Sequence, residues 1–333
     1  MRPLLALLLL LAVAPARADL NTDGLPAGAA AVMGFDFANF RATKFGGAIE
    51  SLASLKAKDL EVSRKLRERV GIDTDHDIRD FVVAVYPGAD GKVAEKSASG
   101  VVLIRGKFLP ARIDRFGQEN GVPSKAVGRH QAWKAAPFIE KLTGEQPKDG
   151  ANDAYLVAHS ENLVLLAGAE FLERALAAAD RNERAPQLPA AIATKFAAAR
   201  QGWFYLYADA TKMEKAKEEA GIQDLALVLG ENATDLQLAA AAGFVSPEKA
   251  SVMRKQIKGL QAFAMIGLSN DDGKSPEEKE NLALLSELVE KIRIGGEGRQ
   301  TTLDLDFPAD RAAKAIGKVV EKARKSPAAP AAK

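Results

Sequence analysis

Two aspartates occupy matching places in the sequence and are the acids best placed to act together. Asp36 closes the apolar run Ala29–Phe37, and Asp209 closes the aromatic run WFYLYAD. A large apolar side chain, Phe40 or Met213, follows each of them four residues later. Two carboxylates that pseudo-symmetry brings together could bind a cation or act as acid and base. An aspartate between a strand and a helix is more often an N-cap, so we favour that interpretation and keep the ligand or cation site as the alternative.

The three histidines, His76, His130 and His159, form no recognisable motif. None belongs to the i, i+4 pair of a helical zinc site, and no HExxH segment occurs. The sequence also lacks the GxSxG segment that would supply a nucleophile. We therefore expect each histidine to be a surface or half-buried side chain.

The acids Asp73, Asp75 and Asp77 resemble the start of an EF-hand calcium loop. That loop needs Gly at its sixth position and Glu at its twelfth, where this sequence has Ile78 and Ala84. The pattern favours a turn in which the aspartates bond to nearby backbone groups, with structural calcium as the alternative. We assign no catalytic residue, metal ligand or cofactor-binding residue, and expect no cofactor.

Residues 1–18 are typical of a bacterial secretory signal peptide. Arg2 precedes the apolar run Leu4–Ala14, and Ala16-Arg17-Ala18 is a small-residue cleavage site. The run is shorter than the roughly 20 residues that a membrane-spanning helix needs. We expect cleavage after Ala18, a periplasmic or secreted protein, and no transmembrane anchor. The chain has no cysteine, so disulfides and lipidated cysteines are excluded.

The charge of the processed chain is balanced. The 333 residues contain 46 basic and 44 acidic side chains, and removal of Arg2 and Arg17 leaves 44 of each. A neutral chain gives no electrostatic reason to bind nucleic acid or anionic lipid, and in the local basic stretch Lys56–Arg69 acids interleave, which favours a solvated helix face. We expect no nucleic-acid partner, and envelope or protein partners stay open.

A strand followed by a proline-led helix occurs twice at a constant spacing. Val101–Arg105 is an apolar strand that precedes Gly106 and Pro110, and Gly243 and Pro247 repeat this pair 137 residues later. Proline is favoured at the first position of a helix because its φ is already helical and its missing N–H has no partner there. Thr302–Val319 is a looser third copy.

Further elements follow from hydrophobic spacing. Phe45–Val70 is predicted as an amphipathic helix, Ala262–Leu268 as a buried strand, and 121–150 as less regular. Ser275-Pro276-Glu277-Glu278 predicts a helix start with a capping box. Phe81–Tyr86 is apolar on both pleat faces, which indicates a sheet that is covered on both sides.

These patterns predict an α+β fold with mostly antiparallel sheets and two similarly built halves. We expect a first half over 19–182, a second half over 183–325 and a disordered Pro/Ala-rich tail over 326–333. The shared order of elements suggests internal duplication, and Asn182–Pro189 is the expected linker.

The sequence resembles an uncharacterised family of exported Gram-negative proteins. The resemblance rests on an ordered series of short segments: the leader, LPAGAAAVMGFDF, GIDTDHDIRDFVVAV, GVVLIRGKFLPARI and NLVLLAGAEFLERAL. It implies export and a two-part α+β fold, and it brings no activity or functional residue. We expect a non-enzymatic binding or envelope-associated protein. The alternatives are a carrier of an apolar, lipid-like ligand, which the small residues Ala239–Gly243 could accommodate, and a hydrolase without a recognisable motif.

Overall fold

The computed structural model describes residues 22–53, 57–88, 91, 93, 99–144, 153–183, 202–213, 221–269 and 275–325. The predicted leader, most of the predicted linker and the predicted tail lie outside these residues. The described part contains one twelve-stranded antiparallel sheet with helices packed on it, which confirms the α+β fold class. Strand order across the sheet is β11-β12-β10-β9-β8-β1-β2-β3-β7-β6-β5-β4.

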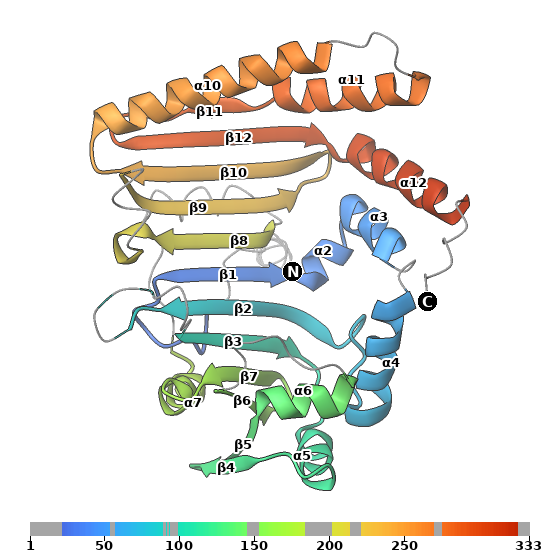
Figure 1. Cartoon of the computed structure of the whole chain (residues 1–333), viewed down its shortest axis with the longest axis vertical. Helices are drawn as coiled ribbons and strands as arrows, with labels where there is room; N and C mark the ends of the chain where they lie inside the picture. The colour runs from blue at the N-terminus through green and yellow to red at the C-terminus, as the bar shows by residue number, and fades with distance from the viewer. Residues whose placement is uncertain are drawn as a thin grey trace, which may run out of the picture.

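The first half supplies the strands from β1 to the edge strand β4 (Figure 1). Its strands are β1 (Ala31–Asp36), β2 (Ile78–Tyr86), β3 (Ser99–Gly106), β4 (Ser124–Val127), β5 (His130–Lys134), β6 (Ala154–Ser160) and β7 (Leu163–Gly168). Its helices are α2 (Phe37–Arg41), α3 (Lys44–Ala53), α4 (Ala57–Val70), α5 (Pro110–Glu119), α6 (Ala135–Thr143) and α7 (Leu172–Asp180).

The second half supplies the strands from β8 to the opposite edge. Its elements are β8 (Gly202–Asp209), the 3-10 turn η1 (Ala210–Lys212), β9 (Ile222–Glu231), β10 (Asp235–Phe244), α10 (Pro247–Ser269), α11 (Pro276–Glu290), β11 (Arg293–Gly295), β12 (Gln300–Pro308) and α12 (Ala309–Lys325). Figure 1 shows α10 and α11 side by side along the β11 edge of the sheet.

The two halves share one strand order. From the centre outward, β1-β2-β3-β7-β6 corresponds to β8-β9-β10-β12-β11, and the β4–β5 hairpin extends only the first half. The central strands β1 and β8 pair in antiparallel register, with Phe35 opposite Phe204, so the sheet is continuous. The observed order fits the two similarly built halves of the sequence analysis, and internal duplication stays a prediction.

The halves also interlock through side chains. Buried Glu231 of β9 accepts hydrogen bonds from the backbone N–H groups of Lys44 and Phe45, at 2.9 and 3.0 Å, and thereby caps α3 of the first half. Trp203 of β8 packs against Phe35 and Phe40, with ring centroids 5.6 and 4.9 Å apart. A carboxylate that accepts two backbone N–H groups is a strong, charge-assisted contact, so α3 is fixed by both halves.

Helices cover both faces of the sheet around β7, but the predicted cover on both sides of Phe81–Tyr86 is found on one side, because Val82, Ala84 and Tyr86 are buried whereas Phe81, Val83 and Val85 are half-buried. On one face, Leu172 and Leu176 of α7 pack with Leu103 and Leu165 in one buried cluster. On the other face, a second cluster joins buried side chains of α5, α6 and the sheet: Ile113, Phe116, Trp133, Phe138, Leu142 and Val164. Burial on both faces explains why β7 is apolar without alternation, whereas β2 has one buried face and one half-buried face.

Three predicted segments differ from the structure. The predicted buried strand Ala262–Leu268 is wrong, because these residues form the last turns of α10. The predicted irregular stretch 121–150 contains β4, β5 and α6. Phe45–Val70 is described as two helices, α3 and α4, instead of one. The capping box is confirmed, since Ser275 and Glu278 bond reciprocally to each other's backbone N–H.

Candidate functional site

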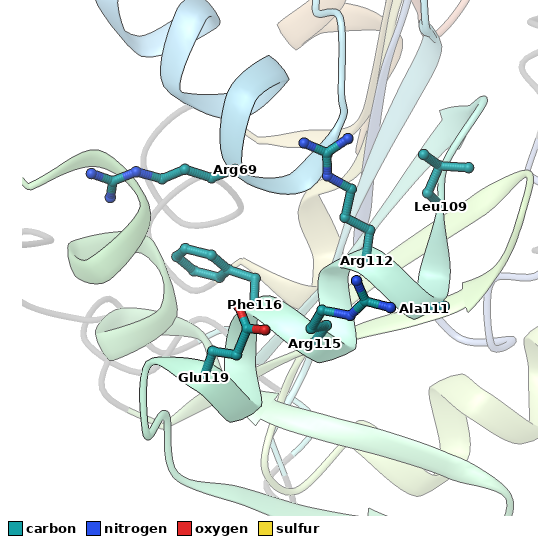
Figure 2. A pocket seen from close by; sticks show the side chains of 7 residues that line it. All are labelled: Arg69, Leu109, Ala111, Arg112, Arg115, Phe116 and Glu119. Carbon is teal, nitrogen blue, oxygen red and sulfur yellow. The ribbon is translucent and has the colours of Figure 1, made fainter.

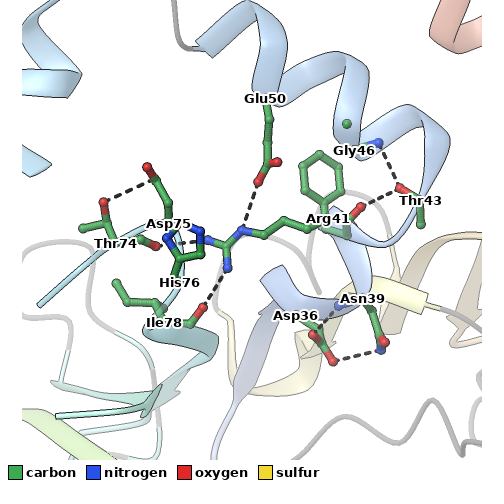
Figure 3. A network of polar contacts seen from close by, with 12 residues as sticks. Asp36, Asn39, Arg41, Thr43, Gly46, Glu50, Thr74, Asp75, His76 and Ile78 are labelled. Atoms are coloured by element: carbon green, nitrogen blue, oxygen red, sulfur yellow. Dashed lines mark hydrogen bonds and ion pairs between the residues drawn. The ribbon is translucent and has the colours of Figure 1, made fainter.

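Asp36 is an N-cap. It closes β1, and its carboxylate accepts hydrogen bonds from the backbone N–H and the side-chain amide of Asn39, both at 2.9 Å (Figure 3). Burial raises the pKa of Asp36, the bond from Asn39 opposes that rise, and Asp80 on β2 adds to it. The contacts confirm the capping interpretation of this residue.

Asp209 plays the same part in the second half. It closes β8, and its carboxylate accepts bonds from the backbone N–H and the hydroxyl of Thr211, at 3.1 and 2.5 Å. Lys212 lies 3.4 Å from the other carboxylate oxygen. Both oxygens therefore have local partners within the η1 turn.

The structure does not bring the two aspartates together. Asp209 donates its backbone N–H to Ala30, just before the start of β1, whereas Asp36 lies at the far end of that strand. At about 3.3 Å per residue, six residues of strand separate them by roughly 20 Å. Each aspartate instead lies opposite another acid in register, Asp80 for Asp36 and Asp224 for Asp209.

The Asp73 segment is a turn held by local bonds. The backbone N–H of Asp73 bonds to the carboxylate of Asp77 at 2.8 Å, and that of Asp75 bonds to Asp73 at 3.1 Å. Arg41 of α2 donates to the carbonyls of Thr74 and Ile78 and so ties the turn to the sheet (Figure 3). These bonds agree with the predicted turn.

The structure brings two of the three histidines together. His130 and His159 stack with ring centroids 4.7 Å apart, and both Nε2 atoms approach the same oxygen of Asp180, at 3.6 and 3.1 Å. Burial, followed by the neighbouring His159, lowers the pKa of His130 below its ordinary value. Spacing along the sequence does not reveal this grouping, because the pairing of β5 with β6 creates it. The third histidine, His76, is exposed, and its Nδ1 lies 3.3 Å from Oδ2 of Asp73.

A surface hollow of about 560 Å³ lies between α4 and α5 (Figure 2). Among the arginines that line it, Arg69 donates to the carbonyls of Lys141 and Leu142, and Arg112 donates to that of Glu68. Glu119 also lines the hollow and supplies a negative charge. Because two guanidinium groups hold the scaffold together, the hollow is a weak candidate for an anion site.

The outer face of α10 carries four of the seven exposed large apolar side chains in the described part of the chain. Leu260, Phe263 and Ile266 are 68, 75 and 70% exposed, and Val252 is also exposed. Their spacing places them within about a third of the helix circumference, at roughly 100° per residue, as one row on the outer face. We call Val252, Leu260, Phe263 and Ile266 the α10 row.

The opposite face of α10 holds the helix to the protein. Gln261 donates to the carbonyls of Val289 and Ile292 at the end of α11, and Ser286 of α11 donates to the sulfur of Met265. Ala250 is fully buried, and its carbonyl accepts a bond from Thr301 of β12. Because the inner face is fixed in this way, the α10 row is presented outward on a firmly attached helix.

α10 is also basic. It contains Lys249, Arg254, Lys255 and Lys258 against one acid, Glu248, which gives a formal charge of +3. Arg254 points inward and donates to the carbonyl of Gln300, whereas the three lysines belong to exposed positions. Lysines beside an exposed apolar row are typical of a helix that lies in a membrane–water interface.

No family model and no curated protein matches the sequence, in agreement with its resemblance to a family without an assigned activity. The solved structures that are similar include three crystal forms of the protein TP0453. Form III has a TM-score of 0.44 at 12% identity and covers 90% of this chain and 99% of that one. Form I has a TM-score of 0.42 at 14% identity and covers 91% of this chain and 99% of that one. Form IV has a TM-score of 0.42 at 11% identity and covers 88% of this chain and 95% of that one. With TM-scores below 0.5, these likenesses say nothing about the function of this chain.

Proposed function

We propose that this protein is exported and binds reversibly to an anionic membrane surface of the cell envelope through the α10 row. The observation that carries the proposal is the exposure of Leu260, Phe263 and Ile266 on a basic helix. The predicted leader over residues 1–18 supports delivery to the envelope. The binding is non-enzymatic and uses no cofactor.

A membrane surface explains two features of α10 at once. Large apolar side chains exposed on one face are costly in water and gain free energy when they enter the acyl-chain boundary. The flanking lysines, Lys249, Lys255 and Lys258, give a positive border that anionic lipid headgroups complement. A purely apolar protein partner would explain the row but not the lysines.

Magnitudes favour reversible binding over anchoring. Complete burial of one large apolar side chain contributes about 1.5–3 kcal/mol, so three side chains that are about 70% exposed contribute roughly 3–6 kcal/mol before any cost. Each lysine near an anionic surface adds about 1 kcal/mol. The total is comparable to one myristoyl chain, which binds membranes only marginally. The part of the chain that the structure describes has no helix with the length and apolarity to cross a bilayer.

Vesicle co-sedimentation of the purified protein tests the proposal. Vesicles of phosphatidylglycerol and phosphatidylethanolamine are expected to bind it, and phosphatidylcholine vesicles are expected to bind far less. Phe263→Glu is expected to lower binding at least tenfold, because a charge replaces the central side chain of the row. Leu109→Glu is the matched control, since Leu109 is also an exposed apolar residue, 53% accessible, but lies at the start of α5.

Equal loss of binding in both variants, or undiminished binding by Phe263→Glu, would reject the α10 row as the binding surface. The other occupant of the α10 row is a second copy of the chain, and sedimentation velocity without lipid tests for the dimer that would result. A dimer that Phe263→Glu dissociates would replace the membrane proposal with self-association. The apolar-ligand carrier and the hydrolase stay predictions that no described contact tests.

A further inference from the structure

We propose that His130, His159 and Asp180 form a site for a divalent transition-metal ion, of which Zn²⁺ is the type. This inference is independent of membrane binding. In the described part of the chain, these residues are the one group of three metal-ligating side chains whose donor atoms lie within 4.8 Å of one another. They come from three separate elements, β5, β6 and α7.

The fold places the three groups on one face of the sheet. β5 pairs with β6, with Trp133 opposite Leu156, and three residues further along this register His130 lies beside His159. Both histidines alternate onto the face that α7 covers, because Ala132 and Val157 pack there with Leu176. Asp180 is the last residue of α7, and the C-terminal end of a helix favours a positive ion.

The distances are close to those of a first coordination shell. Zn²⁺ binds imidazole nitrogen at about 2.0–2.1 Å and carboxylate oxygen at about 2.0–2.2 Å, so tetrahedral ligands lie roughly 3.3 Å apart. The observed separations from Oδ1 of Asp180 are 3.1 Å to Nε2 of His159 and 3.6 Å to Nε2 of His130. Both nitrogens converge on one oxygen, so a small movement of Asp180 makes room for an ion among the three.

The two imidazoles are largely removed from solvent. Their side chains are only 9 and 10% exposed, and Nδ1 of His159 is buried without a hydrogen-bond partner. The nitrogens that face Asp180 are the two Nε2 atoms, so Nδ1 of His159 is not one of the proposed ligand atoms. Two imidazoles and one carboxylate leave a fourth position open, which is the ligand set of solvent-accessible zinc sites.

Arg129 occupies the position that competes with the ion. Its Nη2 lies 2.7 Å from the same oxygen of Asp180, and its Nε lies 3.3 Å from Nε2 of His130. The side chain is 75% exposed, so it is free to turn toward solvent. Removal of this guanidinium therefore distinguishes two roles of the group. If the group is only a structural ion pair, the protein loses stability; if it is a metal site, its affinity for the ion rises.

Isothermal titration of the EDTA-treated protein with Zn²⁺, together with the visible d–d absorption of bound Co²⁺, tests the site. We expect one ion per chain and a tetrahedral-type Co²⁺ spectrum. His130→Gln and Asp180→Asn should each weaken binding about tenfold or more. His76→Gln is the matched control, because His76 also lies beside an aspartate, Asp73, but without a third ligand. It should leave the affinity unchanged.

Arg129→Gln should tighten Zn²⁺ binding severalfold while circular dichroism shows the fold intact. This gain is a readout that a misfolded variant cannot imitate. The proposal is overturned if the protein binds no Zn²⁺, if His130→Gln binds as tightly as His76→Gln, or if Arg129→Gln weakens binding.

Discussion

In each half of the sheet a helix follows the third strand, and the two helices differ in the exposure of their apolar residues. α5 and α10 each begin at a proline four residues after a glycine. α5 turns Ile113 and Phe116 into the core, whereas α10 leaves Leu260, Phe263 and Ile266 exposed. The shared local signal thus sets where the helix begins, and the distribution of apolar residues around the helix sets what it contacts.

The physical difference lies in the number of apolar faces. α5 is short and has one apolar face, which the β-sheet and α6 cover. α10 has an inner face that packs on α11 and β12 and a second apolar row that no described element covers. The second row does not help the fold, and we interpret it as a binding surface for that reason.

The largest expected effect contrasts one phenylalanine from each helix. Phe116→Ala should lower the free energy of unfolding by about 3–5 kcal/mol, because it leaves a cavity beside Phe138, whose ring packs 5.1 Å away. Phe263→Ala should change it by less than about 0.5 kcal/mol, because the side chain is mainly exposed. Urea unfolding of both variants measures the contrast, and equal losses would mean that α10 buries its outer face.

A smaller effect concerns a charge pair of the first half whose arginine has no charged counterpart at the matching described position of the second half. Arg105 of β3 bonds to Asp80 at 2.8 Å with both side chains nearly buried, and its counterpart in β10 is Ala242. Arg105→Ala should lower the free energy of unfolding by up to about 3 kcal/mol, because it leaves buried Asp80 with the exposed Arg79 as its one remaining ionic partner among the described residues.

The double variant Arg105→Met, Asp80→Leu is the control for Arg105→Ala, since it removes both charges and keeps apolar volume. It should recover most of the lost stability in chemical denaturation. If Arg105→Ala unfolds like the unmodified protein, the ion pair does not distinguish the halves.

The smallest effect is a pH dependence in the second half. Burial, followed in smaller measure by the charge of Asp209, raises the pKa of Asp224, while a backbone N–H from Gly243 opposes the rise. The folded state therefore holds this proton at a pH where the unfolded chain has released it. The contribution of Asp224 to the free energy of unfolding is therefore fully present below the unfolded-state pKa. It is lost as the pH rises through the higher folded-state pKa.

Asp224→Asn should remove this part of the pH dependence and be slightly stabilising at pH 7. Unfolding curves collected from about pH 4 to pH 7 test the sign. A steeper loss of stability with rising pH in the variant would contradict the assignment.

The sequence predicted those features that local chemistry decides. The helix starts at Pro110, Pro247 and Ser275 are local signals, and each is found in the structure. The capping role of Asp36 follows from its place between a strand and a helix. The order of helices and strands in the two halves could be inferred because the apolar residues of each element recur with a helical or a strand period.

What the sequence did not predict depends on tertiary contacts. Ala262–Leu268 is a short apolar run, and periodicity alone cannot separate a buried strand from a helix with two apolar faces. The pairing of β5 with β6 brings His130 beside His159, although 29 positions separate them in the sequence. Spacing rules for helical metal sites cannot find such a pair.

The central claim is that the outer face of α10 enters an anionic membrane surface. The variant Phe263→Trp places a fluorescent reporter in the middle of the α10 row, while the native Trp133 and Trp203 are buried and report a constant background. We predict that vesicles of phosphatidylglycerol shift the added emission to shorter wavelength and that lipids brominated in the acyl chain quench it. Emission that stays unchanged while the protein binds the vesicles, or an equal shift in Leu109→Trp, would contradict the account.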